Sequence, residues 1–340
     1  MIPLTPHIRQ PAPWQSELAS AITDPAELLR LLQLDDALLP AAQRASRLFP
    51  LRVPRGFVAR MALRDPDDPL LRQVLPLDAE FDQAPGFGED AVGDLASSLA
   101  PGLLHKYQGR VLLVTTAACA VHCRFCFRRH FPYADQTAAR GQWDAALKWI
   151  GASPDISEVI LSGGDPLSLS DHKLGHLTAA VDAIPHIRRI RIHTRQPVVL
   201  PERIDDRLLA WVKRLQAAVT IVLHVNHDKE INADFRHACQ RLRAAGAMLL
   251  NQTVLLRAVN DTGDTLAALS EKLFDCGVMP YYIHLLDRVK GTAHFEVSQS
   301  RAQTLIAELL VRLPGYLVPK LVCEKAGAPS KVPVPPLGSC

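Results

Sequence analysis

Three closely spaced cysteines are the residues of this chain best suited to metal chemistry. Cys119, Cys123 and Cys126 lie in the run A-C-A-V-H-C-R-F-C-F-R-R-H, so a C-x3-C-x2-C pattern places three thiolates in one loop. A closed zinc or iron–sulfur site normally takes four protein ligands. Three ligands leave one position open, and a metal centre with an open position can bind a substrate or cofactor and act on it.

A closed structural centre is the alternative interpretation of the same loop. A distant fourth ligand would then complete a zinc or iron–sulfur site, and the candidates are a histidine or one of Cys239, Cys276 and Cys323. Cys239 and Cys276, however, lie in apolar stripes of predicted helices, which favours a place in the core. The spacing alone does not choose between an open and a closed centre.

Length and composition restrict the class of protein. With 340 residues, 48% of them hydrophobic, the chain can bury a large core. The formal charge is only +3 and no block of like charge occurs, so we expect neither nucleic acid nor a membrane surface as partner. The start lacks the pattern of a secretory signal, and seven cysteines, an odd number, fit thiolate ligands in a reducing compartment. We therefore expect a cytoplasmic protein.

The elements that must position the cysteines begin after a helical extension. In residues 1–104, Asp24 provides a helix N-cap, Pro25 the first helical position and Glu27 the third, ahead of a leucine-rich run. From about residue 105, short β-branched runs alternate with amphipathic helices, two of which end at Gly246 and Gly277. The six predicted strands are Val111–Thr116, Glu158–Ser162, Arg189–Thr194, Val219–Val225, Met248–Leu255 and Tyr281–Leu286. This alternation predicts a parallel α/β sheet.

Chemically unusual residues gather near the carboxyl ends of these strands, where parallel sheets carry their active sites. A sheet that served only as a core would not be expected to place so many polar groups at one edge. The chemically unusual residues, in chain order, are Cys119, the turn Gly163-Gly164-Asp165, Arg195, His224, Gln252 and Asp287.

The cysteine loop resembles that of the radical S-adenosylmethionine (SAM) enzymes. In that superfamily three cysteines hold a [4Fe-4S] cluster, and SAM chelates the fourth iron. Leu161-Ser162-Gly163-Gly164-Asp165-Pro166 matches its second motif, G-G-E, with Asp in place of Glu. Alone, G-G-D-P is a turn; one α/β unit after the cysteines, it supports the resemblance, which implies that Gly163, Gly164 and Asp165 bind SAM.

A narrower resemblance, over roughly residues 105–335, is to the lysine 2,3-aminomutases, which use the cluster, SAM and pyridoxal phosphate (PLP). Arg128-Arg129 follows the cysteine loop as in that family. The other matching blocks are Lys106–Leu113, Thr194-Arg195-Gln196-Pro197-Val198-Val199, Leu223–His227, Asn251–Leu256, Pro280–His284 and Pro314-Gly315-Tyr316.

The resemblance assigns roles to residues on both sides of the expected site. Lys331 falls where the family has its PLP-anchoring lysine, which must be neutral to attack an aldehyde. Without the resemblance, a lysine in this tail would be taken for a solvated surface group. The remaining cofactor positions are Tyr107, Arg110 and Gln252 near PLP, His224 near SAM, and Arg195 among the cofactor-binding residues.

Charge predicts how the substrate is selected. The resemblance implies that Arg128 binds the carboxylate of lysine, for which a planar guanidinium is suited. It also implies that Asp287 and Glu324 hold the distal ammonium. One buried cation can stabilise two facing carboxylates in their ionised forms. Without the cation, one of the two carboxylates tends to protonate.

The sequence departs from the family pattern at three places and has a short tail. Lys106 stands where catabolic members have Arg, Glu324 replaces Asp, and Ala326–Ser330 is poor in glycine. The short tail after Lys331 resembles the branch that makes (R)-β-lysine for attachment to elongation factor P.

The resemblance therefore implies a radical SAM, PLP-dependent isomerase that converts L-α-lysine to (R)-β-lysine for modification of elongation factor P. It implies a partial (β/α)6 barrel over residues 105–312, with a helical extension at 1–104 and a C-terminal segment at 313–340 that carries Lys331. The expected partners are L-lysine, an electron donor such as flavodoxin or ferredoxin, and a functional link to elongation factor P and its lysyl ligase.

Three alternatives remain open from the sequence. The first is an aminomutase of free lysine or another amino acid, in catabolism or solute synthesis. The second is a radical SAM enzyme that has lost PLP, which predicts that Lys331→Ala is tolerated. The third is a non-catalytic iron–sulfur or zinc protein with a closed fourth ligand, which predicts no cleavage of SAM.

Overall fold

The parallel strands predicted from the sequence form the centre of the molecule. The computed structural model describes residues 13–136 and 143–336, and all six predicted strands are present, as β3 to β8. The strands are β1 (Ser98–Ala100), β2 (Leu103–Tyr107), β3 (Arg110–Thr116), β4 (Glu158–Gly163), β5 (Arg189–Thr194), β6 (Ala218–Leu223), β7 (Met248–Val254), β8 (Met279–His284), β9 (Lys320–Cys323) and β10 (Val332–Pro333).

All ten strands belong to one sheet whose order follows the chain from β1 to β10. Strands β3 to β9 pair in parallel, while β1 and β2 at one end and β10 at the other pair antiparallel with their neighbours. The predicted partial, open α/β barrel is confirmed. The barrel also contains a parallel strand that the sequence analysis did not predict, β9. Its four residues are too short a run to be recognised in the sequence.

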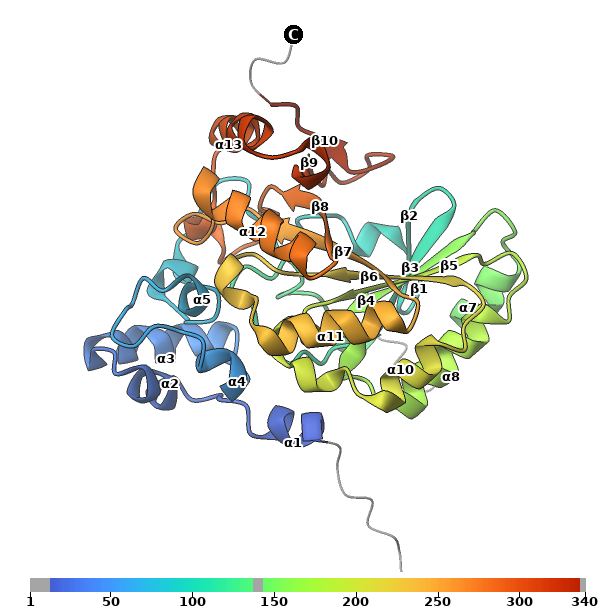
Figure 1. The fold of residues 1–340 in the computed structure, drawn as a ribbon, viewed down its shortest axis with the longest axis horizontal. Coiled ribbons are helices and arrows are strands. Elements are labelled where there is room, and N and C mark those ends of the chain that lie inside the picture. Colours follow the sequence, from blue (N-terminus) through green and yellow to red (C-terminus); the bar gives the residue numbers. More distant parts are fainter. Residues whose placement is uncertain (1–12, 137–142, 337–340) are drawn as a thin grey trace, which may run out of the picture.

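The crossover helices cover one side of this sheet, and in Figure 1 α7, α8, α10 and α11 lie below the strands. Both helices predicted from apolar stripes are present as α11 and α12, each followed by a glycine of positive φ. The helices are α1 (Pro13–Ala19), α2 (Pro25–Leu32), α3 (Leu39–Leu48), α4 (Arg55–Val58), α5 (Pro69–Arg72), α6 (Tyr133–Gln136), α7 (Trp143–Gly151), α8 (Asp171–Asp182), α9 (Gln196–Val199), α10 (Asp206–Val212), α11 (Ala233–Ala244), α12 (Gly263–Asp275) and α13 (Gln299–Arg312).

Apolar and polar side chains alternate along the strands, so that the sheet has an apolar outer face and a polar inner face. Ile190 and Ile192 of β5 are fully buried in the main hydrophobic core. Because successive side chains of a strand point to opposite faces, Arg191 and His193 point into the barrel. On β8, likewise, Ile283 packs in a core cluster with residues of α13, so the neighbouring His284 faces inward. The interior is therefore lined by groups that can bind a ligand.

The N-terminal extension packs against the barrel as part of the same core. Helix α2 begins at the predicted N-cap, where the Asp24 carboxylate accepts a hydrogen bond from the Ala26 N–H. Buried residues of the extension, such as Ile22 and Leu28, share one cluster with those of the sheet. The sheet itself includes strands on both sides of the predicted boundaries at 104/105 and 312/313, and the division into three domains stays a proposal.

The cysteines outside the loop are placed as the helix stripes predicted. Cys239 of α11 and Cys276 after α12 are 0% and 1% exposed in the main core, whereas Cys323 ends β9 and is half-buried. Within residues 13–136 and 143–336, no helix is long and apolar enough to cross a membrane.

Candidate functional site

The cysteine loop follows β3 at the carboxyl edge of the sheet. Cys119, Cys123 and Cys126 are all partly exposed, and the Cys126 N–H donates to the Cys123 carbonyl at 3.0 Å. Burial of its sulfur and the neighbouring Cys123 thiol raise the pKa of Cys126 to about 11. Among the described residues no three metal-ligating side chains converge on a single-ion site. The thiols of Cys123 and Cys126 both act electrostatically on Cys119, so the three are neighbours, as ligands to different irons of one cluster would be.

The N-terminal extension holds this loop in place through a buried carboxylate, Glu80. Arg124, inside the loop, donates to both Glu80 oxygens at 2.8 and 2.5 Å, and Arg129 donates to one of them at 2.6 Å. All three side chains are 0–1% exposed. The backbone of the loop is also anchored, since the Arg124 N–H donates to the Gln73 carbonyl at 2.9 Å. Two arginines of the cysteine loop therefore depend on one residue far upstream.

Glu80→Ala is expected to lower the free energy of unfolding by about 3–5 kcal/mol, because it leaves two buried guanidinium groups without their counter-ion. The measurement is urea unfolding of the cluster-free protein. Asp78→Ala is the matched control in the same turn: its salt bridge with Arg44 is half-exposed, and its loss should leave the free energy of unfolding nearly unchanged. Equal losses in the two variants would contradict the anchoring role.

The G-G-D turn packs directly on the start of the cysteine loop. A Cβ on Gly164 would lie 2.5 Å from the Ala118 carbonyl oxygen, and Gly163 has a φ of +119°. The Gly164 and Asp165 N–H groups donate to the carbonyls of Thr116 and Ala118 at 2.7 and 2.8 Å. Both glycines are thus required for close approach to the chain's own backbone, whatever their role toward SAM.

The carboxylate of Asp165 serves the neighbouring loop. It is buried and accepts hydrogen bonds from the Thr194 hydroxyl and from the N–H groups of Leu167, Arg195 and Gln196, at 2.7–3.0 Å. It thereby ties the G-G-D turn to the loop after β5. Contact of Asp165 with SAM stays a prediction.

Arg195 connects a cysteine to a second buried network. Its guanidinium donates to the Cys123 sulfur at 2.8 Å, to Gln73 Oε1 at 2.6 Å and to Glu230 Oε2 at 2.9 Å. Glu230 and Gln73 are 0% exposed, and Asn226 donates to the same Gln73 oxygen at 2.9 Å. The positive charge of Arg195 is therefore held against the sulfur by groups from two separate parts of the chain, Gln73 and the segment that contains Asn226 and Glu230.

On the other side of the barrel mouth, five charged side chains form a line of alternating sign. The Lys331 ammonium lies 2.7 Å from Glu324 Oε2, and Glu324 Oε1 lies 3.1 Å from the Lys106 ammonium. Lys106 lies 2.6 Å from Asp94 Oδ1, and Asp94 Oδ2 accepts from Arg128 Nε at 2.7 Å. The structure thus brings together Lys331, Glu324 and Arg128, which are more than two hundred residues apart at the extremes.

Asp287, the second predicted ammonium-binding residue, lies beside this line. Burial and the negative charge of Glu324 raise the pKa of Asp287 to about 7. For Glu324, burial opposes ionisation, but Lys331 and Lys106 outweigh it and lower the pKa to about 2. The expected protonation of one carboxylate in the absence of a substrate cation is consistent with these values.

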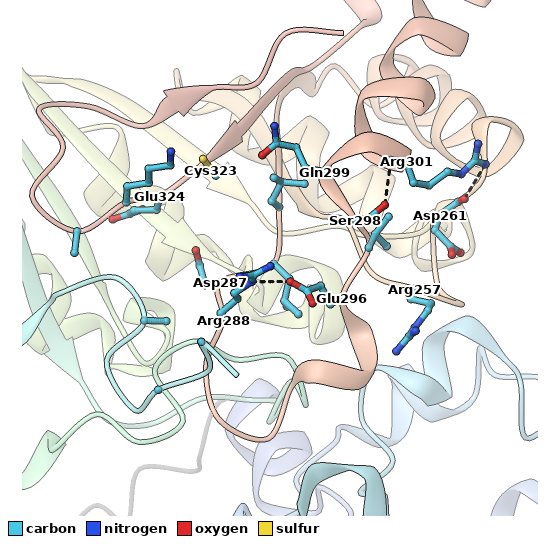
Figure 2. Close-up of a pocket in the computed structure, with 18 of the residues that line it drawn as sticks. Arg257, Asp261, Asp287, Arg288, Glu296, Ser298, Gln299, Arg301, Cys323 and Glu324 are labelled. Atoms are coloured by element: carbon cyan, nitrogen blue, oxygen red, sulfur yellow. Dashed lines mark hydrogen bonds and ion pairs between the residues drawn. The ribbon is translucent and has the colours of Figure 1, made fainter. Parts of the chain in front are cut away.

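A pocket of about 1040 Å³ opens next to these two carboxylates. Figure 2 shows Glu324 and Asp287 at one side of the pocket, and Arg257 and Arg301 at the other. Arg288 pairs with Glu296 at 2.7 Å within its wall. The two predicted ammonium-binding residues, Asp287 and Glu324, are therefore reachable from outside the barrel.

The four remaining predicted cofactor residues lie around the barrel interior. The Arg110 guanidinium stacks 4.7 Å above the Tyr107 ring, and burial and the nearby negative charge of Glu324 raise the pKa of the Tyr107 hydroxyl. Gln252 lies on β7 and is partly exposed. His224 follows β6 and stacks on Phe125 of the cysteine loop, with ring centroids 5.5 Å apart.

Several residues of the site were missed by sequence reasoning. Asp94 and the pair Gln73 and Glu230 occur in segments without a recognised motif. His193 and His284 lie on strands, and strand alternation could have placed both inside the barrel. Burial lowers the pKa of both histidines well below the ordinary value, so they are neutral.

Comparison with known proteins adds the family. The profile of the radical SAM superfamily matches residues 113–265, a segment that contains the three cysteines and the G-G-D turn. An L-lysine 2,3-aminomutase from Escherichia coli (strain K12) is 51% identical over 322 residues, which cover 94% of each chain. One from Haemophilus influenzae is 44% identical over 97% of this chain and 98% of the relative. One from Clostridium subterminale is 34% identical over 95% of this chain and 78% of the relative.

Proposed function

The chain belongs to the L-lysine 2,3-aminomutase family of radical SAM isomerases, and on that premise we propose that it converts L-α-lysine to (R)-β-lysine with PLP as an additional cofactor. We further propose that the β-lysine is destined for elongation factor P. The observation that carries the proposal is the line of charges Lys331–Glu324–Lys106–Asp94–Arg128. This line brings together a primary amine, a carboxylate that could hold an ammonium and a guanidinium that could hold a carboxylate.

The family implies a [4Fe-4S] cluster and SAM, and the residues present fit both. Three partly exposed thiols in one loop form an open donor set for iron. Beside them, the Nε2 atom of His224 is buried and has no hydrogen-bond partner among the described residues. Cys119, Cys123 and Cys126 would hold the cluster, and His224 would meet SAM.

The residues on the other side of the interior fit PLP. Lys331 offers a partly buried primary amine, with a side-chain exposure of 22%. The Nε2 atoms of His193 and His284 are buried without a partner in the described part of the chain, as expected where a ligand supplies the missing contact. Lys331 would anchor PLP, and Tyr107 and Arg110 would line its site.

When bound, the cluster and SAM supply a radical that removes a hydrogen atom from lysine, and PLP supplies the conjugated system through which the amino nitrogen moves. The protein's own groups bind and orient. Glu324, with its low pKa, stays ionised and holds a cation without taking its proton. In the ligand-free protein that cation is the Lys331 ammonium, and with Lys331 anchoring PLP, Glu324 would be left to hold the ammonium of the substrate.

Lysine affinity is expected to increase on the order of tenfold between about pH 6 and about pH 8. The pKa of Asp287 is about 7, so its carboxyl group is neutral below this pH and an anion above it, and only the anion attracts the ammonium. The groups facing Asp287 are Glu324, Lys331, Lys106 and Asp94. The measurement is calorimetric titration of the PLP-loaded, SAM-free protein with L-lysine, whose distal ammonium keeps its charge over this range.

Asp287→Asn is the control for this titration. The amide has no ionisation, so the affinity of the variant should be low and nearly independent of pH. A slope that persists in Asp287→Asn would assign the pH dependence to another group.

An anaerobic assay tests the proposed function as a whole. The reconstituted protein is incubated with SAM, PLP, dithionite and L-lysine, and β-lysine is followed by mass spectrometry. Formation of β-lysine supports the proposal. Cleavage of SAM without β-lysine would retain the radical chemistry and refute lysine as the substrate.

The link to elongation factor P needs a separate test. Elongation factor P and its lysyl ligase are added to the reaction, and the intact mass of the factor is measured. Modification that depends on this enzyme supports the link. Accumulation of free β-lysine with an unmodified factor would favour the alternative, an aminomutase of catabolism or solute synthesis.

A further inference from the structure

Asp94 is a buried acid that contacts two of the cations in the line of charges, Arg128 and Lys106. Its side chain is 3% exposed, and its two oxygens are divided between two partners. Oδ2 accepts from Arg128 Nε at 2.7 Å, and Oδ1 lies 2.6 Å from the Lys106 ammonium. Its own N–H donates to Asp90 Oδ1 at 2.9 Å, so the position of Asp94 is set by its own segment.

The contact with Asp94 determines which part of Arg128 stays available. Asp94 accepts the hydrogen bond from Nε, and Ser162 Oγ accepts one from Nη1 at 2.9 Å. The guanidinium also lies 4.6 Å from the Phe127 ring centroid, which fixes its plane. Neither of these two hydrogen bonds uses the Nη2 amino group, which can donate to an anion. The carboxylate of a substrate would therefore meet the Nη2 end of the Arg128 guanidinium, whose Nε side is held by Asp94.

The contact with Lys106 has a second consequence. The Lys106 ammonium is shared between Asp94, the Val92 carbonyl at 2.7 Å and Glu324 at 3.1 Å, which uses all three of its donors. Without Asp94, the Val92 carbonyl and Glu324 would still hold the ammonium, so binding of the substrate cation would change little. Loss of Asp94 should therefore act mainly through Arg128.

We infer that Asp94 is a positioning residue that orients Arg128 for the carboxylate of the amino-acid substrate. The inference rests on the proposed function, because it assumes that Arg128 meets that carboxylate. Asp94 keeps its negative charge because of two nearby cations. Burial disfavours ionisation of Asp94, but Arg128 and Lys106 outweigh this effect and hold the pKa of Asp94 below the ordinary value. A purely structural ion pair would affect every ligand equally, whereas a positioning role affects only ligands that carry a carboxylate.

The test compares L-lysine with 1,5-diaminopentane, which has the same two amines and lacks the carboxylate. Both are titrated calorimetrically into PLP-loaded, SAM-free enzyme, so that no turnover occurs. In Asp94→Asn the affinity for lysine is expected to fall on the order of 10- to 100-fold, as for a lost charged hydrogen bond. The affinity for 1,5-diaminopentane is expected to change less than about threefold.

Asp68→Asn is the matched control. Asp68 is an equally buried carboxylate of the extension, where it accepts hydrogen bonds from the N–H groups of Leu70 and Leu71. Its loss should leave the ratio of the two affinities unchanged. If Asp94→Asn does not fold, Asp94→Glu, which keeps the charge on a longer side chain, gives the same comparison.

The outcomes separate the inference from the function on which it rests. A loss specific to lysine supports the positioning role. Equal losses for both ligands, or an unchanged ratio of affinities, overturn it while the unaltered enzyme still prefers lysine. If the unaltered enzyme does not distinguish lysine from 1,5-diaminopentane, the assigned role of Arg128 fails, and the inference about Asp94 fails with it.

Discussion

Lys331→Ala is expected to lower β-lysine formation on the order of 10³-fold or more, because it removes the amine that would anchor PLP. The structure supports this role, since Lys331 lies 2.7 Å from Glu324 at the barrel mouth. Two measurements check it: β-lysine in the anaerobic assay, and the PLP absorbance that stays with the protein through gel filtration. Both should be lost together.

Lys325→Ala provides the control for this variant. Lys325 lies in the same C-terminal segment but is exposed. Its replacement should leave both the retained PLP and the product unchanged. If Lys331→Ala still forms β-lysine and retains PLP, the anchor is another amine, and the assignment of Lys331 is wrong.

Cys123→Ser is expected to reduce cleavage of SAM on the order of 10³-fold and to lower the iron bound after reconstitution. A hydroxyl is a poorer ligand for iron than a thiolate, and two remaining cysteines are too few for the cluster. Arg195 would also lose the sulfur to which it donates at 2.8 Å. Iron content, visible absorption and 5′-deoxyadenosine are measured on the same sample.

Cys276→Ala controls for the loss of a thiol as such. Cys276 is 1% exposed in the core, so its truncation should cost about 1 kcal/mol of stability and leave the iron content unchanged. Full iron incorporation and SAM cleavage in Cys123→Ser would show that this cysteine is not a ligand. The open three-cysteine centre would then have to be abandoned.

Local pattern was sufficient for the parallel strands and for the two striped helices. Alternation and apolar stripes are properties of neighbouring residues, and they survive in the fold because tertiary packing buries the same faces that the pattern marks. The short strand β9 escaped this reasoning, because four residues carry too little pattern.

The sequence by itself determined the residues whose chemistry is rare: three cysteines in one loop, the G-G-D turn and, through family resemblance, Lys331 and Arg128. Only the tertiary structure decided how they are held. Lys106 meets Glu324 across 218 residues, and Arg195 meets Gln73 across 122. Aspartate, glutamate and glutamine are common on any surface, so Asp94, Glu80 and Gln73 carry no signal in sequence. They become distinctive only when folding removes them from water and leaves charged partners to satisfy.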